Sequence, residues 1–379
     1  MRRFVLLSAL FAALGAAAAQ EPIVIGVNLE LSGRMTVTGN DTLNGIRVAH
    51  MQQDEVLGRP IELSICDNAS TPEGSIACAN RFVDEGAVAV LGTYASSHSI
   101  PAAGVLQDAG VVMVSTGSTN PATTQVGDFI FRIPYTDQFQ GRVAAQWAWN
   151  EGHGERVAIF RQQDDDYSVG LSGFFQEALE EMGGQTIVLD FTANTVDFSA
   201  QINDLRSFDP TMIYYTGFCA EAATLIPQVR QQGFDVPILG GDASDDAQCP
   251  EGGGQAFDGY TFTSFGEPEV LSGEAAERAT AFGEVYREQY PDAGFTGFVL
   301  AGADAYKVVV AAIEAAGSDD PAAVRDALMQ LENFPGVSGE ITFVGTDGTP
   351  ANRVMGLYAY AVADDGSWEK VVIRGIQLE

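Results

Sequence analysis

The chain has 379 residues, of which 46% are hydrophobic and 18% are charged, a composition typical of globular and not of disordered proteins. Asp and Glu number 51 against 19 Lys and Arg, so the formal net charge is −32. This balance excludes a nucleic-acid partner and an anionic membrane surface, because both attract basic residues. We interpret the acidic excess as a solvated surface that keeps the protein soluble, not as a sign of a cationic substrate.

The first 19 residues have the pattern of a secretory signal peptide. Arg2 and Arg3 supply the positive start, residues 4–14 form a short apolar segment, and residues 17–19 are a small-residue cleavage site. The apolar segment is too short to span a bilayer, and no later stretch reaches the ~18 apolar residues of a membrane helix. No lipobox cysteine lies near the cleavage site, so we expect no lipid anchor. The sequence therefore predicts export of a soluble mature protein to the periplasm.

Strand-like and helical segments alternate in the first third of the chain. The expected strands are 23–29, 60–66, 87–91 and 111–114, and the expected helices are 39–54, 73–85 and 98–109. The strands are nearly continuous apolar runs, and the helices carry apolar residues near the helical period. This alternation predicts a parallel sheet with right-handed crossovers and helices on both faces.

The same pattern begins again after a connecting strand at 129–133. The expected strands are 156–160, 185–191, 212–215 and 236–239, and the expected helices are 138–151, 168–182, 198–207 and 220–232. The two blocks predict an α/β protein with two lobes of the same design, each a doubly wound parallel sheet.

The last third differs, because its helices follow one another without strands between them. They are expected at 273–290, 299–316 and 321–331, before a hairpin-like segment at 339–344 and strands at 354–362 and 368–373. Such helices must cover a sheet that is already built, so we expect crossings between the lobes near residues 134, 264 and 347. The predicted first lobe is residues 20–134 plus 265–346, and the second is 135–264 plus 347–379. Three crossings form a hinge, and two lobes on a hinge form a cleft.

Four cysteines fit an oxidising compartment. Three pairings are possible, and we predict Cys66–Cys78 and Cys219–Cys249, because each pair then stays within one lobe. No C-x-x-C motif occurs and the three histidines are scattered, so we expect no metal site.

Catalytic motifs are absent from the sequence: it contains no G-x-S-x-G, no H-E-x-x-H and no P-loop. His98 lies beside Ser96 and Ser97, but adjacent residues at a helix start point in different directions. We therefore expect His98 to cap the helix or to face solvent. The acidic run 164–166 lacks the alternating spacing of a calcium loop, and we interpret it as a solvated loop before a helix. We expect neither catalysis nor a cofactor.

A second acidic loop follows the strand expected at 236–239. Asp242 comes directly after two glycines at the carboxyl end of that strand, where it can face a ligand. We expect the other two acidic residues of this loop, Asp245 and Asp246, to lie on the surface.

Two further loops lie at the carboxyl ends of predicted parallel strands, where open α/β sheets bind ligands. Residues 92–99 and 115–121 are both rich in glycine, serine and threonine. Hydroxyl groups beside the N–H groups of a helix start can bind a carboxylate, although serine and threonine also cap helices without any ligand. Two such loops on one sheet edge predict a site for a small anion.

The segments that carry these loops resemble the periplasmic leucine/isoleucine/valine-binding proteins of ABC transporters. The matching stretches run in the same order along nearly the whole mature chain: 23–33, 39–45, 67–84, 92–101, 113–121, 162–170, 214–221, 240–242 and 315–321. The resemblance implies the type I periplasmic binding fold and a function in solute capture.

The resemblance also implies roles for residues of the first lobe. In the family, the loops that match Tyr94-Ala95-Ser96 and Ser118-Thr119 bind the α-carboxylate of the ligand through hydroxyl groups and backbone amides. We therefore expect Ser96, Ser118 and Thr119 to hold a carboxylate here.

Other matching positions depart from the family pattern. Tyr167 is expected to close over the ligand from the second lobe, in a loop lengthened by the acidic run. Phe218 replaces a frequent tyrosine, and Asp242 replaces the glutamate that commonly pairs with the ligand's ammonium group. Thr38 replaces a bulky aromatic wall of some relatives, which implies a roomier pocket, and Phe298 is expected on its apolar side.

The favoured hypothesis is a monomeric, periplasmic solute-binding component of an ABC importer. It would capture a branched-chain or similar neutral amino acid in the cleft and deliver it to the membrane permease by hinge closure. Three alternatives remain open: the same fold with an aromatic carboxylic acid or small amide as ligand, a ligand-sensing module, and an exported hydrolase.

Overall fold

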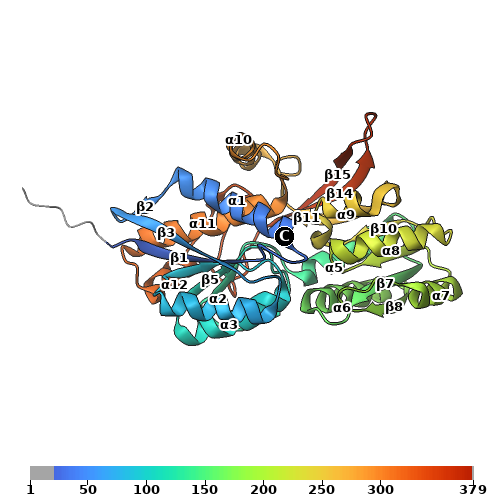
Figure 1. Ribbon diagram of the computed structural model, residues 1–379, viewed down its shortest axis with the longest axis horizontal. Helices are drawn as coiled ribbons and strands as arrows, with labels where there is room; N and C mark the ends of the chain where they lie inside the picture. Colours follow the sequence, from blue (N-terminus) through green and yellow to red (C-terminus); the bar gives the residue numbers. More distant parts are fainter. Residues whose placement is uncertain (1–20, 378–379) are drawn as a thin grey trace, which may run out of the picture.

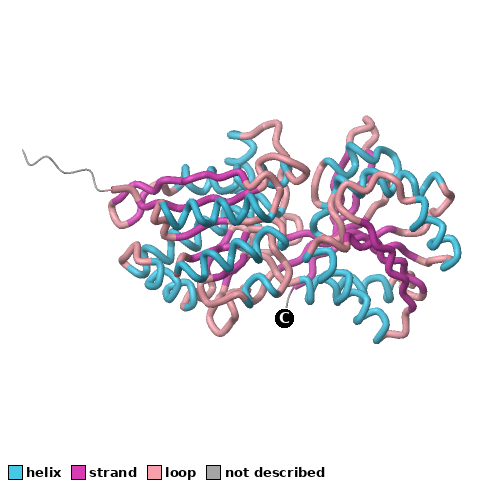
Figure 2. Tube along the Cα trace, turned by 60° about the horizontal axis from the view of Figure 1, so that its bottom comes forward, coloured by secondary structure: helices cyan, strands magenta, loops and turns pink. Residues whose placement is uncertain are grey.

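The computed structural model describes residues 21–377, so the predicted signal peptide lies outside the described residues. Two α/β bodies lie end to end along the long axis of the molecule (Figure 1). In the turned view of Figure 2, the strands of each body gather into a sheet with helices packed along it. No helix within residues 21–377 is long and apolar enough to cross a membrane.

The first body is built on a six-stranded sheet with the strand order β2-β3-β1-β4-β5-β6. Its strands are β1 (Ile23–Leu29), β2 (Glu55–Val56), β3 (Arg59–Asp67), β4 (Ala89–Leu91), β5 (Val112–Ser115) and β6 (Ile130–Arg132). Its helices are α1 (Thr36–Gln52), α2 (Pro72–Asp84), α3 (Ser96–Ala109), α4 (Ala122–Gln125), α10 (Gly273–Gln289), α11 (Gly297–Ala316) and α12 (Pro321–Met329). All strand pairs are parallel except β2 with β3.

The residues of β1 explain why this sheet is covered on both sides. Ile25 and Val27 belong to the core that includes α1 and α11, whereas Val24 packs against the core that includes α2 and α3. Because successive strand residues point to opposite faces, a strand with apolar residues on both faces needs helices on each side of the sheet. In Figure 1 the late helix α11, in orange, lies beside the early helix α1, in blue, and the two pack together.

The second body is built on a seven-stranded sheet with the strand order β15-β14-β11-β10-β9-β7-β8. Its strands are β7 (Arg156–Gln162), β8 (Gln185–Phe191), β9 (Met212–Tyr215), β10 (Ile238–Gly240), β11 (Thr261–Phe265), β14 (Val354–Val362) and β15 (Trp368–Gln377). Its helices are α5 (Asp137–Asn150), α6 (Asp166–Glu181), α7 (Ser199–Phe208), α8 (Cys219–Gln231), α9 (Gln248–Gly253) and the short turns η1 (Asp242–Ser244) and η2 (Gly254–Phe257). Strands β7 to β11 pair in parallel, and β14 and β15 add an antiparallel edge.

The chain passes from one sheet to the other at three places. It leaves the first sheet after Arg132, leaves the second after Phe265, and enters the second sheet again at Val354. The expectation of two lobes, each with a mainly parallel sheet and helices on both faces, is confirmed.

Two details of the predicted elements are wrong. The sequence predicts only a crossing near residue 264 and no strand at β11 (Thr261–Phe265), whose polar residues Thr263 and Ser264 are buried and hydrogen-bonded to side chains. The hairpin expected at 339–344 instead pairs β12 (Phe334–Gly336) with β13 (Gly339–Ile341).

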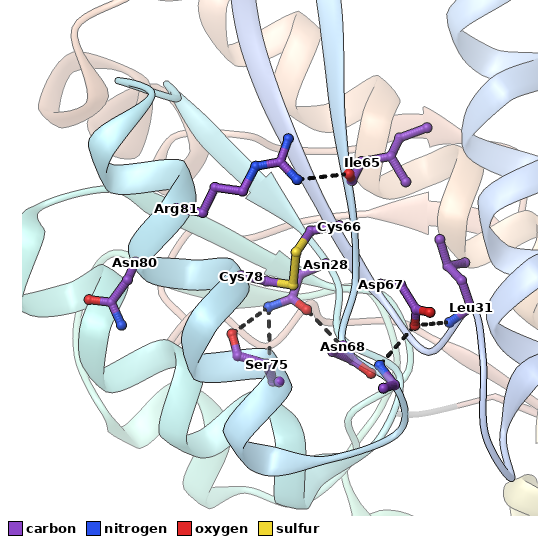
Figure 3. Close-up of a disulfide and its surroundings, with 12 residues drawn as sticks. Asn28, Leu31, Ile65, Cys66, Asp67, Asn68, Ser75, Cys78, Asn80 and Arg81 are labelled. Atoms are coloured by element: carbon purple, nitrogen blue, oxygen red, sulfur yellow. Dashed lines mark hydrogen bonds between the residues drawn. A yellow bond between two sulfur atoms is a disulfide. The ribbon is translucent and has the colours of Figure 1, made fainter.

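Both predicted disulfides are present, Cys66–Cys78 and Cys219–Cys249. Figure 3 shows the first, which joins the end of β3 to α2. Beside it the Asn28 side chain donates to the carbonyl oxygen of Ser75 (3.0 Å) and accepts from Asn68 (3.2 Å). These contacts tie β1, the loop after β3 and α2 together next to the cleft.

Candidate ligand-binding site

One cavity lies between the two bodies, at the carboxyl ends of their parallel strands. The residues that line it come from both bodies: Tyr94, Ala95, Ser96 and Gly117 from the first, and Tyr167, Phe218, Asp242 and Ala243 from the second. Its volume is ≈ 10 Å³, about enough for one water molecule, so the walls nearly touch. The bodies must part, or a ring must turn aside, before an amino acid can enter.

Glu30 anchors the loop that carries Tyr94, Ala95 and Ser96. The fully buried Glu30 carboxylate accepts hydrogen bonds from the backbone N–H of Tyr94 (3.2 Å) and Ala95 (3.3 Å) and from His98 Nδ1 (2.7 Å). His98 is therefore buried against Glu30, and the expectation that it caps the helix or faces solvent is wrong. The sequence could not show this contact, since the two residues lie 68 positions apart.

Ser96 and the second hydroxyl-rich loop form one hydrogen-bonded group. Ser96 begins α3, and its Oγ accepts from Ser118 Oγ (3.0 Å) and from the backbone N–H of Asn120 (3.2 Å). The Oγ1 of Thr119 is buried and has no hydrogen-bond partner within the part of the chain that the structure describes. Thr119 does not line the cavity, and its hydroxyl lies near the Asp137 carboxyl, whose pKa it lowers against the larger effect of burial. The N–H groups of Ser96 and Ser97, the first two of α3, have no acceptor inside the helix and can bind an anion.

Arg132 lies directly beneath this loop and was missed by the sequence analysis. It is fully buried, and its guanidinium donates to the carbonyl oxygen of Ser118 (2.9 Å) and to Thr124 Oγ1 (3.1 Å). Burial lowers its pKa to about 10, so it remains protonated at neutral pH. A positive charge under the hydroxyl-rich loop favours an anion there. The one feature of the sequence that could have pointed to Arg132 is its position inside an apolar strand.

Asp242 faces this group from the second body. It lies in η1, directly after β10, and is 2% exposed. Burial raises its pKa to about 6, an effect that hydrogen bonds from Gln140 and Tyr167 partly offset. None of the ion pairs formed within residues 21–377 involves Asp242, so its charge is not neutralised by a basic side chain. A buried carboxylate without a cation is suited to bind an ammonium group.

Aromatic rings enclose the remaining sides of the cavity. The Phe218 ring makes an edge contact with Tyr94 (6.1 Å between centroids) and lies 5.7 Å from Tyr167. The hydroxyl of Tyr167 reaches this position because Gly241 has no side chain, as a Cβ there would lie 2.2 Å from it. Phe298 packs behind Tyr94 (5.0 Å) and is not part of the cavity wall.

Thr38 does not line the cavity; its hydroxyl donates to Asp246 Oδ2 of the other body (2.8 Å). The expectation that Asp245 and Asp246 lie on the surface is wrong, since both are buried. Asp245 pairs with Lys370 (2.9 Å), which lies 125 positions away on β15 and could not be foreseen as its partner.

Other contacts across the cleft hold the bodies together. Arg34 Nη1 pairs with Glu221 Oε1 (2.9 Å), and Ser97 Oγ donates to Asp165 Oδ2 (2.8 Å). Asp165 also accepts from the backbone N–H of Ser168 (2.9 Å) and so caps α6. The run 164–166 thus lies at a helix start as expected, but the interpretation of it as a solvated loop is wrong for Asp165, which is buried, and Asp166 is the first residue of α6. Within residues 21–377 no group of three or more His, Cys, Asp or Glu is arranged to hold a metal ion.

Comparison with known proteins identifies the family of the chain. The sequence profile described as periplasmic binding protein matches residues 22–367. A relative, Leu/Ile/Val-binding protein homolog 1 of Brucella suis biovar 1 (strain 1330), is 27% identical over 92% of this chain and 93% of its own length. The crystal structure of the leucine-binding protein LivK of Thermotoga maritima MSB8 is similar with a TM-score of 0.86 and 35% identity, over 93% of this chain and 99% of that one.

A second solved structure shares the fold at lower identity. It is an ABC-transporter solute-binding protein of Rhodopseudomonas palustris HaA2 in complex with p-hydroxybenzoic acid, with a TM-score of 0.84 and 20% identity over 95% of this chain and 98% of that one. The match of the family profile covers most of the sequence, and the fold agrees along nearly its whole length. The chain therefore belongs to the periplasmic binding protein family.

Proposed function

We propose that this protein is the solute-binding component of an ABC importer and that its ligand is a branched-chain or similar neutral amino acid. One observation carries the proposal. The Asp242 carboxylate, which has no basic partner, lies across the cavity from the hydroxyl-rich loop 115–121, and the Arg132 guanidinium places a positive charge behind that loop. An amino acid zwitterion has complementary charges at its two ends. The names of the leucine-binding relatives support the same ligand class.

The proposed binding mode assigns a part of the ligand to each side of the cavity. The α-carboxylate accepts hydrogen bonds from Ser96 Oγ and from the N–H groups of Ser96 and Ser97, with Ser118 holding Ser96 in place and Arg132 adding positive charge. Thr119, which lies outside the wall of the present cavity, would join them only if its loop shifts when the ligand enters. The ammonium group donates to Asp242, and the aliphatic side chain packs among the aromatic rings.

The ligand would act by stabilising the closed arrangement of the lobes, proposed as residues 20–134 plus 265–346 and residues 135–264 plus 347–379. Because its two charges are held from opposite lobes, it binds the closed form better than the open form and shifts the hinge equilibrium toward closure. The closed monomer would then deliver the ligand to a permease in the inner membrane, from a periplasmic location. No chemical step is required, so we do not propose an enzymatic activity.

An aromatic carboxylic acid is the second candidate ligand. The hydroxyl-rich loops can bind any carboxylate, the opposite wall is aromatic, and the Rhodopseudomonas protein of the same fold was crystallised with p-hydroxybenzoic acid. Such a ligand would leave the Asp242 charge without a partner in the closed cavity, which makes it the weaker candidate.

A thermal-shift screen of the mature protein tests the proposal. The ligands are the twenty amino acids, several aromatic acids, and urea with short amides. At a concentration 100 times its Kd, a specific ligand adds roughly 2.7 kcal/mol to the free energy of unfolding. We expect a clear shift with leucine, isoleucine or valine. Shifts only with carboxylic acids that lack an amine would overturn the amino-acid ligand and leave the fold unaffected.

A further inference from the structure

Gln140 is the residue that holds the Asp242 side chain in its orientation. Its Nε2 donates to Asp242 Oδ1 (2.8 Å), and its Oε1 accepts from the backbone N–H of Asp242 (3.2 Å). One end of the amide thus binds the Asp242 backbone and the other its carboxylate, so Gln140 ties the position of Oδ1 to that of the main chain. Gln140 itself is fully buried in the first turns of α5.

The same amide also bonds to residues in or beside two of the three chain segments by which the lobes are joined. Its Oε1 accepts from Thr263 Oγ1 (2.8 Å) on β11, the strand after which the chain returns to the first body. It further lies 3.4 Å from the hydroxyl of Tyr135, in the crossing between β6 and α5. A change in the direction of either crossing would therefore move the oxygen that anchors Asp242.

Gln140 is also the donor shared by two buried carboxylates. Besides Asp242, its Nε2 lies 3.4 Å from Asp137 Oδ1. Burial raises the pKa of Asp137, and the charge of Asp242 raises it further, so ionisation of one acid disfavours ionisation of the other. The amide hydrogens favour the ionised form of Asp242, the form that an ammonium group requires.

We propose that Gln140 is the positioning residue of the ammonium site, and that it couples the orientation of Asp242 to the geometry of the hinge. This inference rests on the proposed function. In the closed form Gln140 directs the carboxylate toward the cavity; when the crossings rotate on opening, the carboxylate loses this alignment and the ammonium group is released. Gln140 makes no contact with the ligand, since it does not line the cavity.

The test compares two ligands and two positions. Calorimetric Kd values are measured for leucine and for 4-methylpentanoate, which is leucine without its amino group, with the wild type, Gln140→Leu, Asp242→Asn and the double variant. Gln146→Leu is the matched control, because Gln146 is exposed on the same helix. We expect Gln140→Leu to weaken leucine binding by roughly tenfold or more, with little change for 4-methylpentanoate. In the Asp242→Asn background, Gln140→Leu should raise the Kd for leucine by almost nothing further, since the two residues act together.

The pH dependence of leucine affinity gives a readout that a purely structural role would not move. The groups around Asp242 are Gln140 and Asp137 on α5, Tyr135 just before α5, Tyr167 on α6, Tyr214 on β9 and Asp245 in its own loop, and Tyr94 faces it from the other lobe. Losing the Gln140 donor should move the midpoint of the affinity profile to higher pH, whereas Gln146→Leu should leave it in place. If Gln140→Leu does not fold, Gln140→Asn replaces it in the same measurements, because it keeps an amide but is one methylene shorter.

The outcomes separate the inference from the proposed function. Equal losses for the two ligands, additive losses in the double variant, or an unmoved pH midpoint would overturn the role of Gln140 while amino-acid binding stands. Failure of the wild type to bind any amino acid would overturn the proposed function, and the inference with it.

Discussion

The ion pair between Arg34 and Glu221 should act as a latch for the closed form. Arg34 lies between β1 and α1, and its guanidinium is 2.9 Å from the Glu221 carboxylate of the other lobe and 4.8 Å from the centroid of the Phe218 ring. The Glu221 side chain is 2% exposed, and it also accepts from the backbone N–H of Asn194 (2.8 Å). All contacts of Arg34 with the second lobe are lost when the lobes part, so Arg34→Ala should destabilise the closed form and not the open form.

The size of the effect follows from the two contacts. A hydrogen bond to a buried charged group contributes about 1.5–3 kcal/mol, and a cation–π contact at a partly exposed site about 0.5–1 kcal/mol. A loss of about 2–4 kcal/mol shifts the closing equilibrium by roughly 30- to 700-fold. If the ligand-free protein is mainly open, the Kd of the ligand rises by the same factor, because affinity scales with the population of the competent form.

The assay pairs a binding titration with a distance measurement between spin labels on the two lobes. Arg156→Ala is the matched control, because Arg156 pairs with the exposed Asp209 and both lie in the second lobe. We expect Arg34→Ala to broaden the inter-lobe distances toward the open form and to raise the Kd, and Arg156→Ala to do neither. Unchanged distances and an unchanged Kd for Arg34→Ala would refute the latch.

Two further predictions concern pH and the disulfides. The pKa of Asp41 is raised to about 7, first by burial and then by the charges of other acidic residues, so this carboxyl costs stability increasingly as the pH rises from about 4 to 7. Asp41→Asn should therefore increase the free energy of urea unfolding at pH 8, by up to about 4 kcal/mol, and leave it unchanged at pH 4; an equal gain at both pH values would contradict this. The disulfide Cys219–Cys249 joins the residue after Phe218 to α9, the helix that follows the Asp242 loop. Replacing both of these cysteines by alanine should therefore raise the Kd of the ligand severalfold, and it should also lower the free energy of unfolding by about 2–4 kcal/mol. Replacing Cys66 and Cys78 should lower stability similarly and keep the Kd within about twofold; the same Kd for both double variants would exclude an ordering role for the second disulfide.

The two lobes could be predicted because local patterns determine them. The continuous apolar run of β1 and the regular return of helices predict parallel sheets covered on both faces. The hydroxyl-rich loops could be predicted for the same reason, since adjacent parallel strands place their carboxyl ends at one edge of the sheet. Strand β11 escaped prediction because its burial depends on partners for Thr263 and Ser264 that come from distant segments.

The support of the site could not be predicted, because it depends on pairs far apart in the sequence. Glu30 meets His98 across 68 positions, and Gln140 meets Asp242 across 102. A glutamine within a helix has the same sequence signature whether it faces solvent or orients a carboxylate. Polar side chains in the loops after strands can be recognised in the sequence, whereas the long-range contacts that fix the orientation of those side chains form only in the folded protein.

The central claim is that the cavity holds both charges of an amino acid, and a calorimetric comparison of leucine with 4-methylpentanoate at pH 7 tests it most directly. The wild type should prefer leucine by roughly 30- to 150-fold, as expected for about 2–3 kcal/mol from a buried charged hydrogen bond. Asp242→Asn should remove most of this preference, both by weakening leucine binding and by strengthening the binding of 4-methylpentanoate, which no longer meets an unpaired buried charge. Equal affinities of the wild type for the two ligands, or a preference that survives in Asp242→Asn, would contradict the account.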